Sequence, residues 1–299
     1  MKLAKILYTI SIFVITGFVI LFSMGCRLGI GTIMNPVNIG DSKNVSEEQE
    51  TEPFKNIEVD ANVVNFKIEE GDSYKVKTVY PSGFKTDIDV EGDTLKVEVK
   101  SQKGFDLNVV GFGDIISLGD GLPAKRCDLT VVVPKDGSAV MEDIKIKADA
   151  GNVNLEDRVF DDINIECDAG NVQMKDIKSA TCRIDTDAGN VQVSDCDLGD
   201  MDLKTDAGNI EFDRISMGDM RIKTNMGNID LEGVTFGKGS VDSDVGNIEI
   251  EGSYDKLVAE SDVGAINASS SKEDTVFDIK TQIGAVTVNG DSKGRSYSN

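Results

Sequence analysis

The stretch that decides the fold is residues 182–212, which read CRIDTDAGNVQVSDCDLGDMDLKTDAGNIEF. The tetrapeptide Asp-Ala-Gly-Asn occurs twice in it, and an aliphatic residue follows each copy. In both directions from this stretch the same element recurs. Its central glycines follow one another at a nearly constant interval of 19 places, with one interval shorter and one longer by a single place, and they are Gly151, Gly170, Gly189, Gly208, Gly227, Gly246, Gly264 and Gly284. Chance does not produce such spacing, so the chain is a repeat protein.

Within each repeat the hydrophobic period is two. Apolar or small residues stand seven, five and three places before the glycine, as at Cys182, Ile184 and Thr186, and two and four places after it, as at Val191 and Val193. This alternation predicts two short strands with one buried face. Between them we expect the glycine to supply a positive φ for a tight corner.

The residue after the glycine is asparagine in six repeats. Stacked side-chain amides can hydrogen-bond along the repeat axis and tolerate turn geometry, so we interpret this column as structural. Its members are Asn152, Asn171, Asn190, Asn209, Asn228 and Asn247.

The repeat length selects the architecture. A repeat this short cannot form a propeller blade, and the leucine-rich pattern is missing. Up-and-down hairpins are an alternative, but identical columns fit better an all-β, parallel, right-handed β-solenoid whose rungs, each one full turn, have about 19 residues. We expect eight rungs over roughly 40 Å.

The remaining domain boundaries follow from where the period weakens. Residues 135–290 carry the regular repeats. Residues 54–134 alternate without a strict period, which predicts irregular first rungs that cap the solenoid, and residues 291–299 are a polar tail.

Residues 1–34 predict a membrane anchor. Lys2 and Lys5 precede an uncharged run over 6–26, long enough for one transmembrane helix. The positive-inside rule then places the C-terminal domain outside the cell membrane as a single-pass protein. We favour a signal anchor over the alternative, a lipoprotein signal with lipid on Cys26. Residues 35–53 are acidic and predict a flexible linker.

Composition excludes several function classes. There are 53 acidic residues against 31 Lys and Arg, a formal net charge of −22, which argues against nucleic acid as a partner. The chain contains no His, which removes His-dependent nucleophiles and His-ligated zinc sites. A carboxylate pair could still cleave a glycan, but no residue departs from the repeat as a unique site would. We therefore predict a protein that is not an enzyme, with neither catalytic nor cofactor-binding residues.

An acidic column is the one candidate metal site. The residue two places before each glycine is mostly Asp, and neighbouring carboxylates would lie roughly 5 Å apart. Calcium favours such oxygens, although each Asp could equally cap its own turn. A calcium ladder would use Asp149, Asp168, Asp187 and Asp206.

Three cysteines fall on inward-facing columns. Cys167, Cys182 and Cys196 stand at different heights around the rung, so they do not stack, and we expect buried free thiols rather than a disulfide.

The chain resembles the bacterial putative-adhesin family of unknown function, found in envelope proteins of Gram-positive organisms. The strands from Ile57, the Leu129–Pro134 strand and the Gly-Asn-Val/Ile rungs carry the resemblance over about residues 54–290. It implies a β-solenoid at the cell surface and supplies no catalytic residues.

Together these expectations describe a membrane-anchored binding scaffold of the cell envelope. Its partner would be wall glycan, an envelope protein or a second copy joined through an exposed rung edge. The alternative is an envelope-stress sensor or regulator that acts through a membrane protein. The third and most remote reading is a glycan-active enzyme.

Overall fold

The computed structural model describes residues 44–101, 127–135 and 141–299, which belong to one compact unit. The predicted membrane segment and Cys26 lie outside these residues, as does the first part of the predicted linker, 35–43. Among the residues that the structure describes, no helix is long and apolar enough to cross a membrane.

The described chain consists of strands. The first six are β1 (Asn44–Glu50), β2 (Asn56–Gly71), β3 (Lys75–Pro81), β4 (Phe84–Glu91), β5 (Thr94–Ser101) and β6 (Asp128–Pro134). The repeat region contains β7 (Asp143–Ala169), β8 (Val172–Ala188), β9 (Val191–Ser194), β10 (Asp197–Ala207), β11 (Ile210–Asp213), β12 (Met220–Met226), β13 (Ile229–Val245), β14 (Ile248–Val263), β15 (Ile266–Ser270), β16 (Val276–Ile283) and β17 (Val286–Val288). The last two are β18 (Asp291–Gly294) and β19 (Ser296–Ser298).

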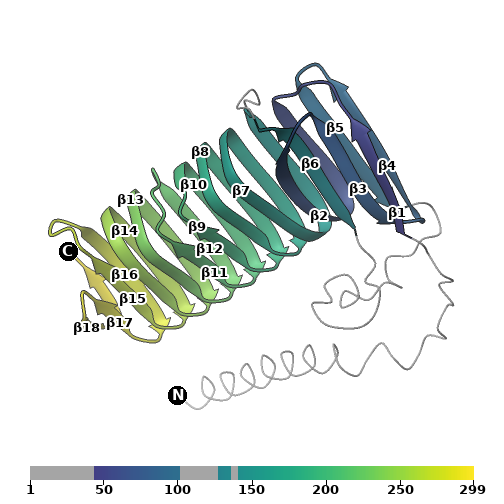
Figure 1. Ribbon diagram of the computed structural model, residues 1–299. Helices are drawn as coiled ribbons and strands as arrows, with labels where there is room; N and C mark the ends of the chain where they lie inside the picture. The colour runs from purple at the N-terminus through teal and green to yellow at the C-terminus, as the bar shows by residue number, and fades with distance from the viewer. Residues whose placement is uncertain (1–43, 102–126, 136–140) are drawn as a thin grey trace, which may run out of the picture. The chain divides into compact units, whose positions relative to one another are not determined.

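The repeats stack as a parallel β-solenoid (Figure 1). From β7 to β13 the strands of successive rungs pair in parallel, and the paired residues are 19 places apart, as are Leu203 and Ile222. The predicted all-β, parallel fold with rungs of about 19 residues is confirmed, with about seven turns rather than eight. The right-handed coil stays a prediction.

Inward residues of successive rungs form continuous apolar columns. In the rung that follows Gly189, the buried side chains are Val191, Val193, Cys196, Leu198, Met201, Leu203 and Thr205. The next rung repeats this pattern 19 places later, and all of these apolar side chains join one core. Because every inward position stacks on its own copy, one repeated pattern is sufficient to build the core of the whole repeat region.

A second corner of the rung carries the left-handed backbone. Six places after the glycine, φ is +53° at Asp157 and Asp176, +54° at Asp195, +55° at Arg214 and +65° at Gly233. In the one shorter rung, between Gly246 and Gly264, the register with β13 shifts between Leu231 and Val234, opposite this corner. The shortened repeat has therefore lost the corner residue, and the register resumes with Gly252 opposite the buried Val234.

Irregular strands extend the stack at the N-terminal end. β2 is the first rung, and it pairs in parallel with β7. β5 pairs in parallel with the first half of β2 and β6 in parallel with its second half. Antiparallel strands follow, with β4 on β5, β3 on β6 and β1 on β3. β1 lies inside the stretch predicted as linker, where alternation is absent because every one of its side chains is exposed.

The C-terminal end is closed in the same way. β18 and β19, inside the predicted polar tail, pair antiparallel with β17 and β16. Tyr297 packs against the core from β19. Antiparallel strands at both ends interrupt the parallel stacking, which otherwise would continue onto another chain.

Candidate functional site

The glycines of the repeat lie where successive rungs approach most closely. A Cβ atom added at any of them would lie 1.4–1.9 Å from a backbone carbonyl oxygen of the preceding rung. Five have φ between +130° and +158°, whereas Gly208, Gly264 and Gly284 are outside the positive range. Close backbone contact, rather than the positive φ expected from the sequence, is the reason shared by all eight positions.

The asparagines form a hydrogen-bonded ladder beside the glycines. The side-chain Oδ1 of each accepts the backbone N–H of the equivalent residue in the next rung, at 3.0–3.2 Å. The ladder runs from Asn152 through Asn171, Asn190, Asn209, Asn228 and Asn247 to the N–H of Ala265. These side chains accept hydrogen bonds from backbone N–H groups at the corner, so their role is structural.

The acidic column stands exposed along one edge. Desolvation, followed by the charges of Asp168 and Asp206, raises the pKa of the Asp187 carboxyl. Asn62 Nδ2 donates to Asp149 Oδ2 at 2.7 Å at one end of the column. Within residues 44–101, 127–135 and 141–299, no three His, Cys, Asp or Glu side chains gather as a metal site would require.

The cysteines of the repeat region are buried thiols. Burial raises the pKa of the thiols of Cys167 and Cys196 to about 11 and that of Cys182 to about 12, and none of the three forms a disulfide. Cys127, before β6, is also buried. Because thiolates carry cysteine reactivity, the three repeat-region thiols act as core residues.

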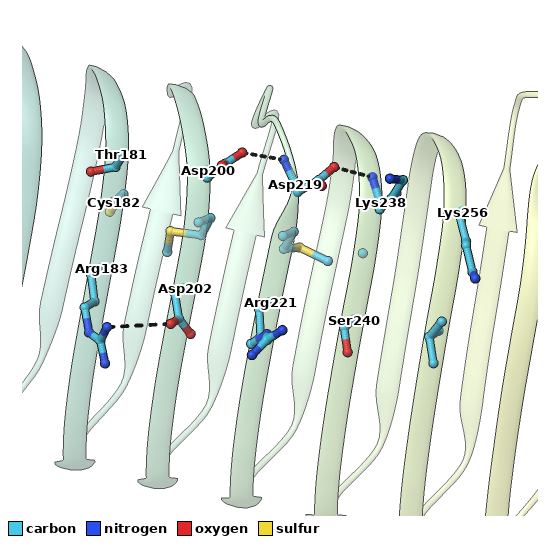
Figure 2. A pocket seen from close by; sticks show the side chains of 14 residues that line it. Thr181, Cys182, Arg183, Asp200, Asp202, Asp219, Arg221, Lys238, Ser240 and Lys256 are labelled. Atoms are coloured by element: carbon cyan, nitrogen blue, oxygen red, sulfur yellow. Dashed lines mark hydrogen bonds and ion pairs between the residues drawn. The ribbon is translucent and has the colours of Figure 1, made fainter.

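A groove crosses the outer face of strands β8, β10, β12, β13 and β14 (Figure 2). The groove has a volume of about 490 Å³. Two rows of outward-pointing side chains form its walls, and the inward-facing residues between the rows form its floor. One row contains Thr181, Asp200, Asp219, Lys238 and Lys256, and the other contains Arg183, Asp202, Arg221, Ser240 and Val258. Each row is a column of the repeat, because its strand residues pair in register from rung to rung. Asp219, which precedes β12, is connected to Asp200 and Lys238 by hydrogen bonds.

The charge of the groove changes sign along its length. At one end Asp200 Oδ1 accepts the N–H of Asp219, and Asp219 Oδ1 accepts the N–H of Lys238, each at 3.0 Å. At the same end, Asp202 Oδ2 lies 3.9 Å from Arg183 Nη1. Arg221 lies on the same rung as Asp219, and Lys238 and Lys256 lie on the next two rungs. These three cations are outside every ion pair formed between described residues. Backbone N–H groups and Arg183 thus provide partners for the three carboxylates, whereas the three cations have no ion-pair partner among the described residues.

The sequence patterns did not reveal this groove. The available signal was the change from Asp200 and Asp219 to Lys238 and Lys256 in a single column. A linear sequence shows this as scattered charges, because these four residues are 18 or 19 positions apart.

Comparison with known proteins supports the fold independently. Residues 54–298 match the protein family described as Toastrack DUF4097. Three crystal structures have similar folds: a "putative adhesin" from Parabacteroides distasonis ATCC 8503, another from Parabacteroides merdae ATCC 43184, and a "putative lipid binding protein" from Parabacteroides distasonis ATCC 8503. Their respective TM-scores are 0.55, 0.52 and 0.52, with 15%, 16% and 15% sequence identity. The aligned regions cover 83%, 83% and 84% of this chain and 97%, 96% and 96% of those chains. No curated protein matches the chain.

Proposed function

The chain belongs to the Toastrack DUF4097 family, and from this premise we propose that it is a non-enzymatic binding scaffold of the cell envelope. Residues 6–26 anchor it in the membrane, and the solenoid stands on the extracytoplasmic side. The names of the neighbouring structures, adhesins and a lipid-binding protein, support a binding role.

The observation that carries the proposal is the uniformity of the outer faces. Most outward positions are polar and stacked in register, from rung to rung, on a core that the repeat itself makes rigid. Such a surface offers many equivalent contacts along one direction, which suits an extended partner. Chemistry on a substrate instead requires one site that differs from its neighbours in geometry and pKa.

Co-sedimentation tests the proposal. The purified chain is mixed with isolated bacterial cell envelopes, with and without millimolar Ca²⁺, next to an unrelated acidic protein of similar net charge. Saturable pelleting of this chain alone supports envelope binding. Loss of pelleting on chelation would assign calcium to the acidic column of Asp149, Asp168, Asp187 and Asp206.

Absence of pelleting in both conditions would refute wall binding. A discrete membrane protein would then become the expected partner, as in the sensor alternative. Cross-linking in intact membranes would identify it.

A further inference from the structure

The basic end of the groove is a candidate ligand site. Arg221, Lys238 and Lys256 lie on β12, β13 and β14, three consecutive rungs, and all three side chains are exposed. Rungs are about 4.8 Å apart, and outward neighbours on one strand are about 6.7 Å apart. Side chains of this length can therefore converge on a single anionic group between them.

The surrounding charge makes this cluster distinctive. The chain has a formal net charge of −22, so an uncompensated positive cluster opposes the average field of the protein. On the same face, Lys223 Nζ lies 3.9 Å from Asp242 Oδ2. Arg183 Nη1 lies at the same distance from Asp202 Oδ2. Asp202 pairs in register with Arg221, but none of the three groove cations has a carboxylate oxygen of a described residue within 4.0 Å, which leaves their charges available to a ligand.

The other half of the groove restricts what that ligand can be. Asp200, Asp202 and Asp219 line it, and their carboxylates would repel a chain with a negative charge on every unit, such as a nucleic acid. Carboxylates accept hydrogen bonds from hydroxyl groups, and Ser240, on the same rung as Lys238, adds a hydroxyl. An anionic group at one end and hydroxyl groups along the remainder describe an acidic saccharide.

We propose that the groove binds an acidic saccharide, with its carboxylate or phosphate held by Arg221, Lys238 and Lys256. The hydroxyl groups of the saccharide lie over Asp200, Asp202 and Asp219. Arg221 provides planar, bidentate contacts and the two lysines add point charges, the usual combination for such anions. This inference rests on the proposed binding function and names its ligand class.

Calorimetric titration of the full chain, in a non-ionic detergent, tests the site. The ligands are lactobionate, which carries one carboxylate, maltose 1-phosphate, and neutral maltose. The groove variant combines R221Q, K238Q and K256Q. A control variant combines K175Q, K178Q and K280Q, which removes the same charge from exposed positions outside the groove.

We expect saturable binding of at least one acidic ligand, with maltose at least tenfold weaker. The groove variant should lose at least tenfold in affinity, and the control variant less than twofold. The preferred acidic ligand then distinguishes a uronic acid from a sugar phosphate as the natural anion.

Three results would overturn the proposal. The first is that neither acidic ligand binds, and the second is that maltose binds as tightly as the acidic ligands. The third is an equal loss of affinity in the groove variant and the control variant, which would indicate long-range electrostatics alone. Envelope pelleting of the same variants separates this proposal from the preceding one. Pelleting without saccharide binding removes the groove ligand and leaves the scaffold function. Saccharide binding without pelleting leaves the groove ligand and refutes wall binding.

Discussion

Replacing Gly208 by alanine should break the stacking at one corner of the solenoid. The added Cβ would lie 1.8 Å from the carbonyl oxygen of Gly189 in the preceding rung, whereas a nonbonded carbon and oxygen come no closer than about 3.3 Å. The two rungs must therefore separate locally by about 1.5 Å. Since the φ of Gly208 is outside the positive range, crowding is the only cost of this substitution.

The cost follows from the hydrogen bonds that cross this gap. They are Gly189 N–H to Ala207 O at 2.9 Å, Val191 N–H to Asn209 O at 3.0 Å, and Asn209 N–H to Asn190 Oδ1 at 3.0 Å. Each contributes about 1 kcal/mol net, so their loss lowers the free energy of unfolding by about 3 kcal/mol. For a domain of this size, that corresponds to a fall in Tm of about 6–12 °C.

Thermal unfolding followed by far-UV circular dichroism measures the effect. Gly92→Ala is the matched control, because Gly92 has a φ of +62° but no atom within 4 Å of an added Cβ. Its cost is backbone strain alone, about 1 kcal/mol. If G208A lowers Tm no more than G92A, the glycines do not act through close rung contact and the reasoning fails.

Four further predictions address buried and exposed side chains. Thr281→Val should lower the free energy of unfolding by about 1 kcal/mol in urea titrations, because Thr281 Oγ1 donates to Gly264 O at 2.8 Å. Thr205→Val should cost nothing, since the buried Thr205 hydroxyl has no partner among the described residues, and equal losses would contradict this assignment. Asp187→Asn should raise Tm at pH 7 and leave it unchanged near pH 3. Folding raises the pKa of the Asp187 carboxyl, so ionisation of this group destabilises the folded protein as the pH rises through that pKa. The same gain in Tm at both pH values would exclude charge as the cause. The thiol of Cys182, with a pKa of about 12, should resist a disulfide reagent at pH 8 until urea unfolds the chain, and fast labelling of the native protein would show that this core opens.

The sequence by itself determined the repeat unit and therefore the stacking. Alternation at period two identifies the inward positions, and a fixed repeat interval means that each of them meets its own copy in the next rung. For this reason the all-β class, the parallel register and the composition of the core follow from a local pattern. The Gly and Asn columns were found in the same way, because each recurs with the repeat.

The tertiary structure alone decided features that do not repeat or that depend on distances between rungs. The role of Gly208 depends on how closely two backbones approach, and the left-handed corner at Asp195 carries no consistent residue type to mark it. The cap strands β1, β18 and β19 have little alternation because most of their side chains are exposed, so the period does not reveal them. The groove exists because Arg221, Lys238 and Lys256, which lie far apart along the chain, become neighbours only when the rungs stack. Local patterns predict the features that every rung repeats. Charged side chains from different rungs become neighbours only in the folded chain, so the site that they form is visible only in the tertiary structure.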